Sequence, residues 1–187
     1  MWSYDLQSRL IRLAAAAAMA GLTAGCAMQP LYAERTISGG PGIMEAMRSV
    51  DVLPIEAANG TPEARLAVEV RDQLLFGLQG GAGEAQTRTH RLRIRLASAN
   101  SSVIVDPVTG RTDVGNYRLT GTYELYESRN EKPVITGTVS ARVSFDVPGQ
   151  QQRFARARGQ RDAETRAAKV IAEDIKARLA SYFVAGT

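Results

Sequence analysis

The chain has 187 residues, which is enough for one domain with a sizeable hydrophobic core and too few to expect two. Hydrophobic residues make up 44% and charged residues 22%, a composition typical of a folded domain, and this excludes disorder for most of the chain. The 23 Lys and Arg against 19 Asp and Glu give a formal net charge of +4, a mild excess that favours anionic partners without indicating nucleic acid.

The first 25 residues are typical of an export signal. Arg9 and Arg12 provide a positively charged start, Leu10 to Ala20 form an apolar run, and residues 23–25 are the small residues that a signal peptidase accepts. The apolar run is shorter than the roughly 20 residues that a membrane-spanning helix needs. We therefore expect residues 1–25 to be a signal peptide and the mature chain to be exported.

Cys26 is the only cysteine, so it cannot form a disulfide within the chain. Its place after three small residues resembles the lipobox of bacterial lipoproteins, with Thr23 where Leu is usual. In a lipoprotein this cysteine becomes the N-terminus and carries acyl chains such as palmitate, which anchor the protein to a membrane. Ala27 follows it rather than Asp, a pattern that resembles proteobacterial lipoproteins of the outer membrane. We predict that Cys26 is lipidated.

The mature chain divides into a tether and one domain. Residues 26–47 contain two prolines and three glycines without periodicity, and they are predicted to be the lipidated N-terminus and a flexible tether. Residues 48–187 carry the periodic patterns of strands and helices. They are predicted to form a single α+β domain.

The first half of this domain predicts a strand and a helix. An apolar stretch at Val50–Ile55 indicates a strand. Thr61 is a favourable helix cap, Pro62 suits the first helical position and Glu63 suits the helix dipole. Glycines between residues 77 and 83 are expected to end this helix.

The second half predicts three strands and a long helix. Apolar and basic residues alternate strictly at 91–96, and the strand is expected to continue through 103–105. Alternation at 117–125 and 135–145 predicts a hairpin, with Tyr117, Leu119 and Leu125 on one face of its first strand. Residues 152–183 predict a helix whose apolar stripe contains residues 163, 167, 170, 171, 175, 179 and 182, with Glu164 mostly off the stripe. The order β-α-β-β-β-α predicts an α+β fold with two helices packed on one face of a four-stranded, mostly antiparallel sheet.

The residues give little support for catalysis. His90 is the only histidine, and no nucleophile motif surrounds it, so a strand-end or partly buried imidazole is the expected role. Metal sites built on His and Cys are excluded by count. The glycine run at 77–83 lacks the Lys-Ser/Thr of a phosphate-binding loop. We expect no enzyme activity, no cofactor or metal, and no nucleic-acid partner.

Arginines are expected to collect on the polar face of the sheet. If the hairpin pairs Tyr126 with Val134, the same register places Arg118 directly opposite Arg142, which is unfavourable unless an anion lies between them. We hypothesise that this face contacts phosphates of an anionic lipid or acidic side chains of a partner. The alternative is a solvated face neutralised by Glu124 and its neighbours. The candidate contact residues are Arg91, Arg93, Arg95, Arg118 and Arg142.

Several segments together resemble one family. GCAMQPLYA, a strand ending in LPIE, the strand NYRLTGTYELYE and the closing helix FARARGQRDAETRAAKVIAEDIKARLASYF are similar to the lipopolysaccharide-assembly lipoprotein family, LptE, in its alphaproteobacterial form. The resemblance implies an α+β domain tethered to the inner leaflet of the outer membrane. It also implies that the domain partners the barrel protein LptD as a plug in the polar lumen and helps to deliver lipopolysaccharide to the cell surface.

Two other function classes remain open at this point. One is an auxiliary lipoprotein of an ABC-type lipid-transport system, which would contact a transporter instead of a barrel. The other is a periplasmic hydrolase that uses His90.

Overall fold

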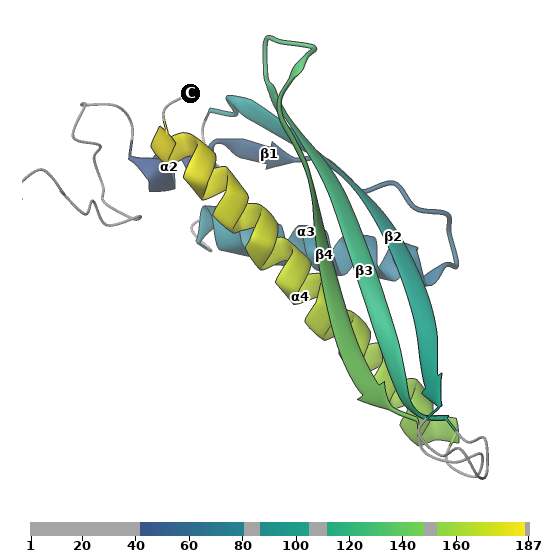
Figure 1. Ribbon diagram of the computed structural model, residues 1–187. Helices are drawn as coiled ribbons and strands as arrows, with labels where there is room; N and C mark the ends of the chain where they lie inside the picture. The colour runs from purple at the N-terminus through teal and green to yellow at the C-terminus, as the bar shows by residue number, and fades with distance from the viewer. Residues whose placement is uncertain (1–41, 81–86, 105–111, 148–152, 186–187) are drawn as a thin grey trace, which may run out of the picture. The chain divides into compact units, whose positions relative to one another are not determined.

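The computed structural model describes residues 42–80, 87–104, 112–147 and 153–185, all within a compact unit that spans Glu34–Thr187 (Figure 1). The expected signal peptide, Cys26 and most of the expected tether lie outside the described residues. The elements in chain order are α2 (Ile43–Arg48), β1 (Val50–Val52), α3 (Pro62–Gln79), β2 (His90–Ile104), β3 (Thr112–Glu127), β4 (Pro133–Asp146) and α4 (Arg153–Ala185). Among these residues, no helix is both long and apolar enough to cross a membrane.

The four strands form one mixed sheet in the order β1-β2-β3-β4. The β2, β3 and β4 strands are antiparallel to one another, whereas β1 runs parallel to β2. A parallel pair follows from the connection, because α3 carries the chain from the end of β1 back to the start of β2, which lies beside the start of β1. The predicted α+β fold and its element order are confirmed, with a sheet that is mixed.

The first strand is shorter than predicted and is preceded by a helix that was not predicted. β1 ends at Val52, and Pro54 has no backbone N–H with which to continue the ladder. The short helix α2 lies at the end of the stretch expected to be tether, and it buries Ile43 and Met47 against α3 and α4. Burial of these two side chains fixes a segment whose own sequence has no strong helix signal.

The start and end of α3 agree with the sequence. The Thr61 side chain accepts a hydrogen bond from the Ala64 N–H at 3.3 Å, and Pro62 is the first helical residue. Gly80 ends the helix with φ of +63°, a left-handed conformation that favours glycine. Leu66, Val70, Leu74 and Leu78 form the buried stripe of the helix.

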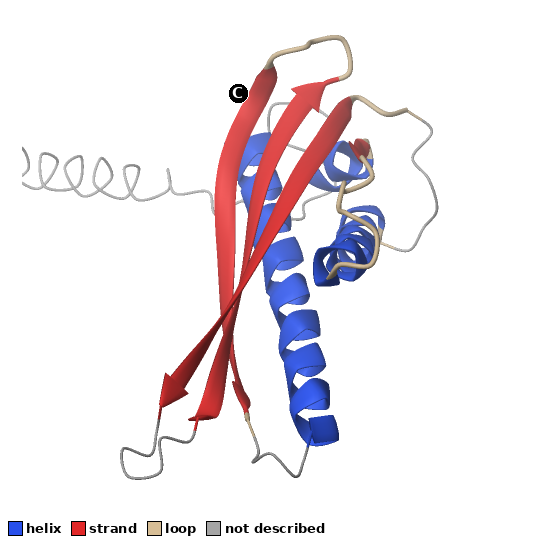
Figure 2. Cartoon of the chain, turned by 90° about the vertical axis from the view of Figure 1, so that its right-hand side faces the viewer, coloured by secondary structure: helices blue, strands red, loops and turns tan. Residues whose placement is uncertain are grey.

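All three helices lie on one side of the sheet (Figure 2). The long helix α4 packs against β3, β4 and α3, and its buried stripe is rich in alanine. Close approach is possible because Gly121 of β3 has no side chain: a Cβ there would lie 3.0 Å from Cγ2 of Ile171. No described element covers the other face of the three long strands, which is called the open face below.

The apolar stripe of α4 was predicted correctly except at one position. Residues 163, 167, 171, 175 and 179 are buried, as expected. Val170 is 39% exposed, so its placement in the core was wrong. Ala168 and Ala172 fill the turns beside Ile171, and Val170 is rotated out of the interface.

Candidate functional site

The five predicted arginines share the open face of the sheet. Arg91, Arg93 and Arg95 alternate along β2 with buried residues, and Arg118 and Arg142 occupy the equivalent positions of β3 and β4. All five are exposed. The open face therefore carries two basic ends, one formed by β2 near the β3–β4 hairpin and one formed by β3 and β4 further along.

Uncharged residues separate these two ends. The cross-strand row between them consists of Ala97, Thr120 and Ser140. In the next row toward the hairpin, Thr122 lies between Arg95 and Thr138. Because the alanine, threonine and serine side chains are short, the middle part of the open face is flat. It can approach another surface without a bulky side chain in between.

A carboxylate pairs with one of the three arginines at the β2 end. Arg95 forms an ion pair with Glu124 at 2.5 Å, and the Tyr126 hydroxyl donates to the other Glu124 oxygen at 2.8 Å. The hydrogen bond to Glu124 raises the pKa of Tyr126, because the carboxylate favours the protonated phenol. The Arg93 guanidinium lies 5.5 Å from the centre of the Tyr126 ring. The alternative of an internally neutralised face therefore holds for Arg95 alone, since Arg91 and Arg93 form no ion pair within the described residues.

The other end has two arginines side by side. Arg118 pairs with Arg142 in the β3–β4 register, as the sequence predicted. The hairpin differs from the prediction, because Tyr126 pairs with Pro133 rather than with Val134. The register then shifts by one residue, and from the Leu125–Ile135 pair onward the pairing is the expected one. Within the described residues, neither guanidinium forms an ion pair or a hydrogen bond. This arginine pair is the strongest candidate for an anion contact on the open face.

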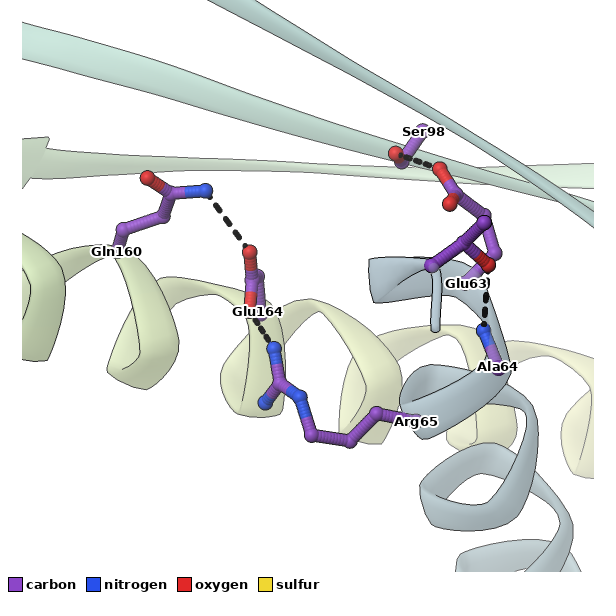
Figure 3. Close-up of polar contacts among 7 residues, drawn as sticks. Glu63, Ala64, Arg65, Ser98, Gln160 and Glu164 are labelled. Carbon is purple, nitrogen blue, oxygen red and sulfur yellow. Dashed lines mark hydrogen bonds and ion pairs between the residues drawn. The ribbon is translucent and has the colours of Figure 1, made fainter. Parts of the chain in front are cut away.

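A buried polar cluster on the helical side was not predicted. Glu164 of α4 was expected on the polar side of its helix but is only 2% exposed. It accepts hydrogen bonds from Arg65 of α3 and, at 3.0 Å, from Gln160 (Figure 3). Its main partner lies 99 residues away in sequence, so no local pattern could reveal the contact.

A second carboxylate sits beside this cluster. Glu63 in the first turn of α3 accepts a hydrogen bond from Ser98 of β2 at 2.5 Å (Figure 3). This bond, with a smaller contribution from the Glu63 backbone N–H, lowers the pKa of the Glu63 carboxyl below its usual 4.5. Together the two carboxylates tie both helices to each other and to the sheet, which is a structural role.

His90 occupies the first position of β2. Its Nδ1 lies 2.8 Å from the Thr89 hydroxyl, and its ring meets the Phe183 ring edge-on with centres 5.2 Å apart. Burial lowers the pKa of His90, and the charge of Glu127 opposes that shift. The imidazole packs between the sheet and the end of α4, as expected for a strand-end histidine.

A sheet with helices on one face and an open second face is the fold of several small bacterial lipoproteins. A lipoprotein from Caulobacter crescentus shares 18% identity with this chain at a TM-score of 0.59, and the match covers 78% of this chain and 97% of that one. Rare lipoprotein B from Shewanella oneidensis (15%, TM-score 0.51, 72% and 97%) and a minor lipoprotein from Acinetobacter baumannii (12%, TM-score 0.51, 72% and 92%) have the same fold.

The family follows from the sequence itself. Residues 47–179 match the model of the lipopolysaccharide-assembly family LptE, and the chain belongs to that family. No curated protein matches the chain in sequence. The family is one of lipopolysaccharide-assembly lipoproteins, not of enzymes.

Proposed function

We propose that this chain is an outer-membrane lipoprotein that partners an LptD-like barrel as a plug and assists the delivery of lipopolysaccharide to the cell surface. The observation that carries the proposal is the LptE family match, which runs from α2 through most of α4 and so includes the whole sheet. Membership in this family favours lipopolysaccharide assembly over an auxiliary role in an ABC-type system and over a hydrolase that uses His90.

The proposal requires that Cys26 be lipidated. Acyl chains on Cys26 would hold the chain at the membrane, since each buried CH₂ contributes about 0.8 kcal/mol and two or more chains give stable attachment. Mass spectrometry of the protein purified from membranes should find an N-terminal, acylated Cys26. An unmodified Cys26 after an uncleaved leader would rule out the anchor.

The open sheet face suits a wide barrel. The lumen of a large outer-membrane barrel is polar, and this face presents threonine, serine and arginine side chains. Affinity isolation of the tagged chain from gently solubilised outer membranes should recover a heat-modifiable barrel protein in about equal amounts. Recovery of the chain without any such protein would contradict the proposed partnership.

The proposed role of the arginine pair is to contact an anionic group. Charge-assisted bonds to a phosphate or a carboxylate would relieve the repulsion between Arg118 and Arg142. The test is the double variant Arg118→Gln/Arg142→Gln. Its matched control is Arg129→Gln/Arg178→Gln, which removes the same charge from exposed positions elsewhere.

Two measurements separate the sources of the anion. Weaker binding to vesicles that contain a phosphomonoester lipid, in the arginine-pair variant alone, would identify a lipid phosphate. Reduced recovery of the barrel with unchanged vesicle binding would identify a carboxylate of the partner. Wild-type values in both measurements would contradict the role of the pair.

A further inference from the structure

The strand β4 forms an edge of the sheet that no other described strand covers. It runs for 14 residues, pairs with β3 on one side, and is last in the strand order. The helix α4 lies on the helical side of the sheet, where it packs against β4 and β3 (Figure 2). A free edge presents a row of backbone donors and acceptors to any extended chain that approaches.

The direction of the β4 backbone can be traced across the sheet. The Leu53 N–H donates to the Leu92 carbonyl at 3.0 Å, so the backbone N–H and C=O of Leu92 point toward β1. Because this direction alternates along a strand, the N–H and C=O of Arg93 point toward β3. Arg93 pairs with Glu124, and Glu124 pairs with Thr136. Because Glu124 turns toward β2, Thr136 turns its N–H and C=O away from β3, toward the free edge.

The same direction holds along β4. Alternation gives Thr138, Ser140, Arg142 and Ser144 the same backbone orientation as Thr136. An independent contact agrees, because the Ser144 carbonyl accepts a hydrogen bond at 3.4 Å from Arg166 of α4, which lies outside the sheet. These residues also expose their side chains on the open face.

Apart from the Ser144 carbonyl, which Arg166 occupies, this edge lacks the usual protection against strand addition. Proline, lysine and bulges commonly block edge strands, yet the only proline of β4 is its first residue and the register shift lies beside the hairpin. From Thr136 to Ser144 the pairing is regular and Arg142 is the single charge. The open edge of β2, in contrast, carries the exposed Arg93 and Arg95.

The charge pattern indicates what this edge would accept. A strand added beside β4 places one residue directly opposite Arg142, extending the row Ala99, Arg118, Arg142. An acidic residue at that position supplies the carboxylate that the arginine pair lacks. A hollow of about 460 Å³, lined by Phe145, Gly159 and Arg166 among others, lies between the end of β4 and α4 and leaves room for a side chain of the added strand.

We propose that β4 binds an extended segment of the protein partner as a fifth, antiparallel strand, with an acidic residue opposite Arg142. This inference rests on the proposed function, because the barrel partner supplies the segment. It identifies β4 as the partner-contact edge of the sheet and the partner's carboxylate as the anion that the arginine pair meets. The interaction is a β-strand addition, in which backbone bonds supply affinity and alternate side chains supply specificity.

Two pairs of variants test the edge in the full-length, membrane-anchored protein. Ser140→Pro removes an N–H that faces the free edge, and Asn100→Pro does the same on the open edge of β2. Ser140→Lys places a charge at the free edge, and Ala177→Lys places one at an exposed position of α4 away from the open face. Barrel recovery should fall about tenfold for both Ser140 variants and stay within about twofold of wild type for both controls.

A photo-cross-linker at position 138 identifies the occupant directly. The cross-linked peptide is expected to come from the barrel partner and to contain an acidic residue. Wild-type recovery of the barrel by both Ser140 variants would overturn the inference and leave the proposed function intact. Absence of the barrel from the wild-type isolation would overturn both. Cross-links to a second copy of this chain, with loss of a dimer in Ser140→Pro, would overturn the partner assignment.

Discussion

Arg118 of β3 lies directly opposite Arg142 of β4 on the open face of the sheet, and within the described residues no carboxylate pairs with either guanidinium. Cross-strand neighbours of like charge destabilise a sheet. Retention of this arrangement in a folded domain is consistent with a requirement for positive charge at that place, which the proposed function supplies as an anion contact.

Removing one of the two charges should stabilise the isolated protein. Arg142→Gln is expected to raise the free energy of unfolding by about 0.2–1 kcal/mol at low salt, because it removes a cross-strand repulsion. Urea unfolding at low and high ionic strength measures this gain, which salt should diminish by screening. A loss of stability at low salt would mean that Arg142 has a structural partner.

The buried carboxylate of Glu164 should make Arg65 important for stability. Arg65→Met leaves Glu164 buried without its cationic partner and should cost about 1–3 kcal/mol in the free energy of unfolding. The control is Lys169→Met, whose ion pair with Glu173 is exposed on both sides and contributes about 0–1 kcal/mol. Equal effects of the two substitutions would argue against a structural role for the cluster.

Stability should fall in acid partly through Glu63. The pKa of Glu63 is lowered in the folded state, so its stabilisation is present above the unfolded pKa and is lost as the pH falls through the folded pKa. Ser98→Ala removes the main cause of the shift. Unfolding measured from neutral pH down to about pH 3 should therefore show a shallower acid loss for Ser98→Ala than for wild type. Identical slopes would contradict the prediction.

Two glycine-to-alanine substitutions should change the stability of the protein in opposite directions. A Cβ at Gly137 would lie 2.5 Å from the hydroxyl oxygen of Tyr123, so Gly137→Ala should destabilise the protein by about 1–3 kcal/mol. A Cβ at Gly159 within α4 meets nothing closer than the Asp146 carbonyl oxygen at 3.4 Å. Gly159→Ala should therefore stabilise the protein by about 0.5–1 kcal/mol. Thermal unfolding of both variants checks the pair, and a matching sign would show that the Tyr123 ring moves freely.

Much of the fold could be predicted because strand alternation is a local signal. Apolar residues at every second position placed Tyr117, Leu119 and Leu125 in the core, and all three are buried. The Arg118–Arg142 pairing followed from a constant antiparallel register, and it survived an error at the hairpin because the register shift is confined to Leu125 and Tyr126.

The missed features depend on contacts between distant segments. The helix α2 is held by buried Ile43 and Met47, and its six residues carry no capping side chain. Glu164 is buried because Arg65 reaches it from another helix. The free edge of β4 is a property of strand order, since the same alternating sequence is compatible with an interior strand.

Lipopolysaccharide at the surface of depleted cells tests the central claim most directly. When the chain is depleted from its host, antibody labelling of intact cells should show a loss of surface lipopolysaccharide, and re-expression of the wild-type chain should restore it. Re-expression of Cys26→Ala should not restore it, because that variant has no anchor. Normal surface lipopolysaccharide after complete depletion would contradict the account.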